Sequence, residues 1–237
     1  IELVVLASIL ALIIGIPLGM FAATHHHKLV DKLIYNMSML AYSMPIFWWG
    51  IILIMFFSLN LGITPVAGRL SFLFDIEPVT GFILIDTLMS TEPYHMDAFK
   101  NALLHLTLPV FALATLPTAI ITRMTRQTML DVLSKDYMLT AQANGLSRFK
   151  IYWVHGFRNA LIPLTEMLGL QISTLMTGAM LTEYLFSWPG IGKWLLDALE
   201  KNDFSSLQGG ILITAVMVIL INASIEIFQA WLNPKLR

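Results

Sequence analysis

The sequence lacks cysteine and is poor in charge. With no cysteine among 237 residues, disulfides and thiolate metal sites are excluded. Charged residues make up 12% of the chain, about half of the roughly 25% usual in soluble domains. Hydrophobic residues make up 57%, and the mean hydropathy is +0.75. This composition, with its long uncharged runs, places the chain in a lipid bilayer. The net charge of −1 gives no global field that would favour nucleic acid.

The chain also lacks a phosphate-binding loop of the pattern G-x-x-x-x-G-K-[ST]. It cannot supply that kind of ATP site, so energy for any transport must come from another subunit or from an ion gradient. The first residue, Ile1, is not methionine, and an apolar run is under way by Leu3. We therefore expect the sequence to begin inside a longer protein. The first run is not a signal peptide, because no basic flank precedes it and no fitting cleavage site follows.

Five stretches are long and apolar enough to cross a membrane as helices, which takes about 20 residues each. Their length and continuity predict an all-α, polytopic transmembrane helix bundle rather than barrel strands. Prolines at positions 17, 45, 109, 117 and 163 lie in or beside these stretches, where they can kink a helix. The predicted spans are Leu3–Thr24, Leu33–Leu59, Ala102–Thr122, Ala160–Tyr184 and Leu207–Leu232.

Basic residues divide unevenly between the two sets of loops that these spans create. Because cytoplasmic loops carry an excess of Lys and Arg, the richer set is predicted to be cytoplasmic, together with the C-terminus. Ile1 then lies on the outer side, and at least one more span is expected before it. The richer set holds ten residues, Lys28, Lys32, Arg123, Arg126, Lys135, Arg148, Lys150, Arg158, Lys235 and Arg237, and the other holds four, Arg69, Lys100, Lys193 and Lys201.

Two segments are predicted on the outer side. The segment 60–101 is a long acidic loop, and loops of this length are usually functional or carry short elements of their own. Its apolar pieces suggest that it lies on the membrane surface or against other loops. The second segment contains Trp188, a Pro-Gly turn and Trp194, and its tryptophans fit interfacial anchors.

The third and fourth spans are joined by a polar cytoplasmic hairpin, residues 134–158. Ser134 can cap a helix by accepting a backbone N–H, and Asp136 then lies in the first turn, where the helix dipole favours an anion. Tyr137, Ala141 and Gly145 share one face at spacings of four, so another protein can approach closely at the two small residues. Gly145 is a natural helix stop. Chemistry alone leaves a plain connector equally open.

Ser147 can begin the second helix of the hairpin, which leads past His155 to Pro163. The pattern Thr140-Ala141-x-Ala143-x-Gly145, followed by Arg158-Asn159-Ala160-Leu161-Ile162-Pro163, resembles the "EAA" loop of binding-protein-dependent ABC importer permeases. Further strings resemble the dipeptide/oligopeptide branch over essentially the whole chain. They are Arg123-Met124-Thr125-Arg126, Leu168-Gly169-Leu170-Gln171, Leu181-Thr182-Glu183, Phe186-Ser187-Trp188-Pro189-Gly190-Ile191-Gly192, Gln208-Gly209-Gly210 and Asn233-Pro234-Lys235, with Thr80-Gly81-Phe82 and Leu84-Ile85-Asp86 in the outer loop.

The resemblance implies a six-span permease subunit of a bacterial inner membrane, here without its first span and the outer segment that follows. It implies a paralogous second permease, two ATP-binding subunits that hold ATP and Mg, and an extracytoplasmic solute-binding protein. The hairpin would be the coupling helix that inserts into an ATPase groove. Interface residues would be Asp136, Tyr137, Thr140, Ala141, Ala143, Asn144, Gly145, Arg148 and Arg158.

The sequence departs from the family pattern at one position of the hairpin. Leu139 stands where the general pattern has an acidic residue, and Thr140 replaces its first alanine. A salt bridge from position 139 is therefore not available. Docking would rest on shape and on Asp136, Arg148 or Arg158.

Acidic residues within the spans are further candidates, because intramembrane acids usually face a bundle interior or a cavity. Glu166 and Glu183 are predicted at the pathway or at a subunit interface, and Glu226 near the cytoplasmic end of its span. His25-His26-His27 could hold a metal, but adjacent helical side chains point in different directions, so a juxtamembrane role is favoured.

The predicted function is import of dipeptides or oligopeptides, with nickel or another small solute as alternatives within the same class. A gradient-driven secondary transporter is the alternative from another class, and it would show inverted repeats and central ion-coordinating residues. An intramembrane enzyme is a third alternative. Ser43, Ser173 and His105 are candidates for it by residue type alone.

Overall fold

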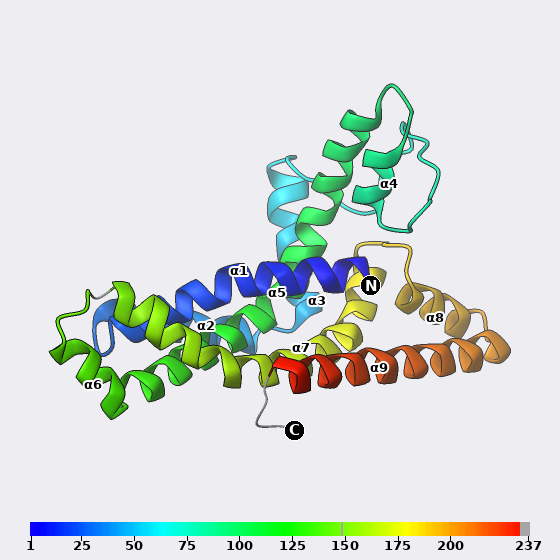
Figure 1. The fold of residues 1–237 in the computed structure, drawn as a ribbon. Helices are drawn as coiled ribbons and strands as arrows, with labels where there is room; N and C mark the ends of the chain where they lie inside the picture. The colour runs from blue at the N-terminus through cyan, green and yellow to red at the C-terminus, as the bar shows by residue number, and fades with distance from the viewer. Residues whose placement is uncertain (148, 233–237) are drawn as a thin grey trace. The chain divides into compact units, whose positions relative to one another are not determined.

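The computed structural model describes residues 1–147 and 149–232, and these ranges contain helices and no strand (Figure 1). The all-α prediction is therefore confirmed for them. Side chains of several helical residues, Leu139 and Glu166 among them, lie outside the description. The elements are α1 Glu2–Thr24, α2 Leu29–Ser43, α3 Ile46–Leu53, the π-helix η1 Ile54–Asn60, α4 Ile83–Met89, α5 His95–Leu133, α6 Asp136–Ala143, the π-helix η2 Lys150–Phe157, α7 Arg158–Leu185, α8 Ile191–Glu200 and α9 Phe204–Leu232.

Three described helices are long and apolar enough to cross a membrane, namely α1, α5 and the Phe204–Ile227 part of α9. The pair formed by α2 and α3–η1 adds a fourth if it is one broken span. The fourth predicted span coincides with α7, where many side chains lie outside the description. The count of five spans therefore stays a prediction.

The predicted span Leu33–Leu59 is interrupted rather than continuous. Met44 and Pro45 both have extended backbone, with φ/ψ of −83°/122° and −62°/135°. Proline disfavours helical backbone at the residue before it, so α2 ends at Ser43 and α3 begins at Ile46. The prolines at 17, 109, 117 and 163 lie inside helices, which membrane helices tolerate.

The chain forms two compact units, and each is described by itself. The first unit comprises residues 1–7, 45–114 and 175–217. Its core joins Leu53 of α3 to Leu108 and Ala112 of α5 and to Phe186, which follows α7 and is 1% exposed. Burying an aromatic ring of this size is a large apolar contribution to a small core. This core therefore joins α3 and α5, between which most of the loop 60–101 lies, to the segment after α7.

The second unit comprises residues 8–44, 115–174 and 218–237. In it, α1 approaches α5 closely at two glycines. A Cβ at Gly15 would lie 2.9 Å from Cγ2 of Ile121, and one at Gly19 would lie 2.5 Å from the carbonyl oxygen of Thr122. Small residues permit such backbone proximity between membrane helices. A neighbouring core cluster adds Met20, Ala23, Met129, Ala160 and Leu164 from α1, α5 and α7.

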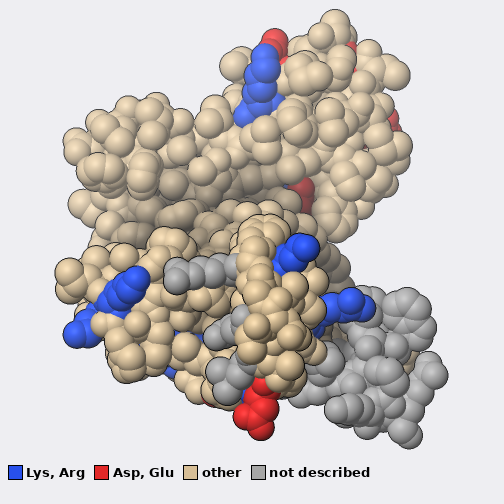
Figure 2. Space-filling view, turned by 60° about the vertical axis from the view of Figure 1, so that its left-hand side comes forward, with Lys and Arg blue, Asp and Glu red and all other residues tan. Residues whose placement is uncertain are grey.

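The surface of the molecule is mostly uncharged. On the face shown in Figure 2, blue and red side chains are few and separated by wide uncharged areas. Large apolar side chains such as Ile13, Ile219 and Ile227 are more than 60% exposed. Exposed apolar helix faces of this kind match a lipid environment rather than water.

Candidate functional site

The predicted hairpin contains a short helix, α6, that ends at a glycine. The backbone N–H of Asn144 donates to the carbonyl of Thr140 at 3.0 Å, which closes the last turn. Gly145 follows with φ of 72°, and no atom lies within 4 Å of where its Cβ would be. A left-handed glycine directly after a helix is the usual C-terminal stop, so the predicted stop at Gly145 is confirmed.

The described side chains of α6 range from fully buried to exposed. Met138 is fully buried, at 0% exposure, and Tyr137 beside it is 48% exposed. Ala141 is half-buried. Sequence reasoning missed Met138 because a lone methionine in a polar segment gives no periodic signal. The other described residues predicted for the interface, Asp136, Thr140, Ala143, Asn144, Gly145 and Arg158, are exposed, whereas Arg148 lies outside the described residues.

The start of α6 differs from the prediction. Ser134 does not cap α6, because its hydroxyl donates to the carbonyl of Asp131 at 2.9 Å and its backbone N–H donates to Leu130. It therefore belongs to the end of α5. Ser147 does begin the second helix, since its Oγ accepts from the N–H of Lys150 at 3.5 Å and its carbonyl accepts from Ile151.

The second helix of the hairpin runs without a break into the next long helix. The π-helix η2 ends at Phe157, and α7 begins at Arg158. Pro163, to which the second helix was expected to lead, lies inside α7. The helix α6 contacts η2, which is continuous with α7.

A second polar cluster ties the link between α1 and α2 to α5. Nε of Arg126 donates to Oδ1 of Asp31 at 2.5 Å and Nη2 donates to Oδ2 at 2.8 Å, a two-pronged ion pair. Oδ2 also accepts from the backbone N–H of His27 at 3.1 Å and lies 3.2 Å from Nδ1 of His26. Asp31 thus accepts hydrogen bonds from Arg126 and from the backbone of His27, with its side chain 4% exposed. Two of the three consecutive histidines thus contact this carboxylate, His26 through its ring and His27 through its backbone N–H.

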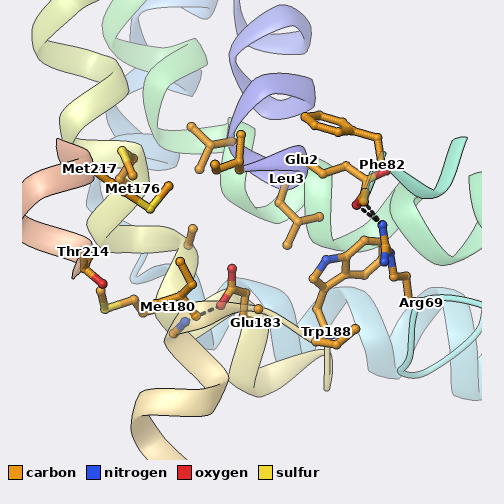
Figure 3. A pocket seen from close by; sticks show the side chains of 18 of the residues that line it. Glu2, Leu3, Arg69, Phe82, Met176, Met180, Glu183, Trp188, Thr214 and Met217 are labelled. Atoms are coloured by element: carbon orange, nitrogen blue, oxygen red, sulfur yellow. Dashed lines mark hydrogen bonds and ion pairs between the residues drawn. The ribbon is translucent and has the colours of Figure 1, made fainter. Parts of the chain in front are cut away.

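In the first unit, a cavity of about 300 Å³ lies between the start of α1, the outer loop and the end of α7 (Figure 3). Nη2 of Arg69 donates to Oε2 of Glu2 at 3.0 Å and to the carbonyl of Gly81. Trp188 lies below the guanidinium, whose Cζ is 5.7 Å from the indole ring centre. The methionines Met176, Met180 and Met217 line the opposite side (Figure 3).

Glu183, a predicted site residue, faces this cavity and holds the start of α8. Its Oε2 accepts from the backbone N–H groups of Gly192 at 2.7 Å and Lys193 at 3.3 Å. These are orphan donors in the first turn of a helix, where a carboxylate is also favoured by the dipole. A Cβ at Gly190 would overlap the Glu183 carboxylate. The glycines of the sequence Pro189-Gly190-Ile191-Gly192 therefore allow the start of α8 to pack against Glu183 of α7.

The loop 60–101, predicted on the outer side, is ordered around Asp86 of α4. One oxygen, Oδ1, accepts from the backbone N–H of Thr80 at 2.7 Å and from its hydroxyl at 2.6 Å, and the other accepts from Gly81 at 3.1 Å. Burial raises the pKa of the Asp86 carboxyl, but the hydrogen bonds from Thr80 and Gly81 outweigh it and leave the pKa below its usual range. The backbone N–H of Gly68, in this loop, donates to the carbonyl of Phe186 at 2.8 Å. The loop therefore packs against the segment that follows α7.

Comparison with known proteins identifies the family of this chain. Residues 15–237 match the family described as binding-protein-dependent transport system inner membrane component. The chain belongs to this family. As an inner membrane component, it is a multi-pass membrane protein, and the system it serves has further components.

Named relatives match all or nearly all of this chain. The di/tripeptide transport system permease protein DppB of Pseudomonas aeruginosa is 51% identical over 236 residues, which span all of this chain and 69% of the relative. The dipeptide transport system permease protein DppB of Escherichia coli K12 is 46% identical over 239 residues, which span all of this chain and 70% of the relative. The putrescine export system permease protein SapB of the same organism is 41% identical, over 98% of this chain and 73% of the relative.

The structure of the inner membrane component gathers the predicted residues into two places. The hairpin residues from 136 to 145 lie together on and directly after α6. Glu183 lines the cavity of the first unit. The side chain of Glu166 is outside the described residues, so its predicted place at the pathway or a subunit interface stays a prediction.

Proposed function

We propose that this chain is the membrane-spanning permease subunit of an ABC importer of dipeptides or oligopeptides. The observation that carries the proposal is its 51% and 46% identity, along its whole length, to proteins named as di/tripeptide and dipeptide permeases. Membership of a binding-protein-dependent family favours this class over a gradient-driven transporter. Substrate would reach it from an extracytoplasmic solute-binding protein.

The energy is proposed to come from partner subunits. Two ATP-binding subunits would bind ATP and Mg and carry out hydrolysis, so this chain itself would not be an enzyme. A paralogous second permease would complete the pathway across the inner membrane. The hairpin 134–158 and the C-terminus are proposed to be cytoplasmic, as the distribution of Lys and Arg predicts.

The hairpin is proposed to couple the ATPase to the pathway. Its helix α6 carries Tyr137 and Ala141 at a spacing of four, and the open space at Gly145, just after the helix, permits close approach. Contact between α6 and η2, and the continuity of η2 with α7, supply a rigid connection. Closure of the ATPase pair would move α6, tilt α7 and open the pathway outward, which is alternating access by rigid-body motion.

An uptake assay tests the substrate. The full-length protein and its partner subunits would be expressed in a bacterium deleted for its own peptide permeases, and uptake of a labelled dipeptide, of nickel and of putrescine would be measured. Dipeptide uptake that stops when ATP is depleted, with the proton gradient maintained, supports the proposal. Uptake of nickel or putrescine alone would replace the substrate, and uptake that follows the gradient would replace the class.

A crosslinking scan tests the coupling role. Single cysteines at positions 137, 141 and 144, on a background without other cysteines, would be paired with cysteines in the ATPase subunit. Nucleotide-dependent crosslinks at 141 and 144 are expected. A cysteine at Ala67, an exposed outer-loop residue, is the control and should not react. Absence of crosslinks at all three hairpin positions in an active complex would reduce the hairpin to a connector.

A further inference from the structure

The second unit contains another cavity, which lies away from α6 and is lined by α1 and by η2 of the hairpin. It has a volume of about 560 Å³ and lies where the C-terminal half of α1 runs beside η2 (Figure 1). Cavities of this size are typical of small-molecule sites. Along the chain its lining changes from Pro17, Leu18 and Phe21 of α1, called the apolar end, to His25 and Lys28 just after α1, called the polar end.

The polar end carries a cation without a described counter-ion. Lys28 is exposed, and its ammonium group makes no hydrogen bond or ion pair with the residues that the structure describes. No Asp or Glu lines the cavity. The acid nearest in sequence, Asp31, is bound by Arg126 and has a side chain that is 4% exposed. His25 is held in place by a 3.0 Å contact between its Nδ1 and the carbonyl of Phe21, and by its ring lying 4.4 Å from the Phe21 ring.

An aromatic row lies along the η2 side of this cavity. Trp153, which lines it, stacks on Phe149 at 6.2 Å between ring centres and meets Phe157 edge-on at 6.0 Å. Phe149 and Trp153 are 67% and 45% exposed. Exposed aromatic side chains at the end of a membrane helix are typical of the bilayer interface, where the ring contacts acyl chains and headgroups together.

We propose that this cavity binds an anionic phospholipid, with its phosphate at Lys28 and an acyl chain along Leu18 and Phe21. The lining of the cavity changes from apolar to cationic, which complements the apolar acyl chains and the anionic headgroup of such a lipid. Basic pockets between membrane helices on the cytoplasmic side bind anionic headgroups. A zwitterionic lipid would bring a second cation toward Lys28 and is disfavoured. The proposal is independent of the transported substrate.

Native mass spectrometry of the full-length protein in its assembled, delipidated complex tests the site. Phosphatidylglycerol and phosphatidylcholine would be titrated separately. Phosphatidylglycerol is expected to bind more tightly, and Lys28→Glu is expected to weaken it at least about fivefold. Lys32→Glu is the matched control, because Lys32 is also exposed and basic but does not line the cavity. It should change binding less than twofold.

A second pair of measurements keeps the test decisive if Lys28→Glu fails to assemble. Leu18→Trp fills the apolar end of the cavity without changing the charge, and it should also weaken the binding of phosphatidylglycerol. A photo-crosslinking amino acid in place of Trp153 should capture a lipid. Equal binding of the two lipids, equal effects of the changes at Lys28 and Lys32, or capture of a protein subunit at position 153 would each overturn the proposal.

Discussion

Glu183 acts on the backbone of a neighbouring helix rather than on another side chain. Its carboxylate satisfies two N–H groups at the start of α8, and glycine is needed nearby because there is no room for a Cβ. The sequence shows the glycines and the acid, but not their partnership, because the residues meet only after α7 and α8 pack together. Transport through the adjacent cavity stays a prediction for this residue.

Substitution of Gly192 tests that packing. In Gly192→Ala the new Cβ would lie 2.7 Å from Cβ of Met180, and overpacking of this kind costs about 1–3 kcal/mol. The thermal midpoint of the purified complex should fall. Gly209→Ala is the control, because Gly209 is in α9 with no atom within 4 Å of its Cβ position. There the midpoint should stay or rise, since alanine favours a helix. Equal midpoints in the two variants would contradict the close contact.

Asp86 predicts a pH dependence of the outer loop. Because its folded-state pKa is lowered, its stabilising contribution is complete above the unfolded value of about 3.9 and is lost as pH falls through the folded value. Asp86→Asn should therefore be less stable than the native protein at pH 7, and the difference should shrink below about pH 4.

Thermal midpoints of the native protein and the variant between pH 3 and 7 would measure that difference. Asp97→Asn serves as the control, because the Asp97 side chain is 70% exposed and forms an exposed ion pair with Lys100. Its midpoint at pH 7 should match the native one. A stability difference for Asp86→Asn that persists unchanged at pH 3 would show that the carboxylate charge is not what orders Thr80 and Gly81.

At the scale of elements, the left-handed glycine after α6 sets the direction of the chain into η2. Gly145→Val should impair transport while leaving membrane insertion intact, because a β-branched residue resists positive φ. Gly145→Asn is the matched comparison, since asparagine tolerates this conformation. Uptake by the valine variant should fall well below that of the asparagine variant. Similar uptake by both, at equal protein levels in the membrane, would mean that the turn geometry does not matter.

Helix type and approximate helix ends could be predicted where one physical cause dominated. Apolar length alone places α1 and α9 within a few residues of their observed ends. The helix α5 is longer than its predicted span because its polar ends, outside the apolar run, stay helical. Ser134 was assigned to the wrong helix because the last turn of α5 competes for its hydroxyl. The π-helices η1 and η2 could not be predicted, because the hydrophobic periodicity used to find helices assumes 3.6 residues per turn.

At the scale of the whole molecule, the family and the all-helical class follow from the sequence, and orientation is the next quantity to measure. Lys135→Cys and Lys201→Cys, both at exposed positions, would be made singly on a background without other cysteines. A maleimide that cannot cross membranes should label position 201 in intact cells and position 135 only after permeabilisation. The reverse pattern would invert the assignment made from the ten and four basic residues.

The Asp31–Arg126 pair also has a consequence for how the protein is made. Its partners are 95 residues apart in the chain. At about 5–20 residues per second, a ribosome needs roughly 5–20 s after Asp31 to deliver Arg126. During that interval the carboxylate has no guanidinium to bind, so the link between α1 and α2 must stay in water. The arrival of α5 then closes the link, so this ion pair forms only after α5 has been made.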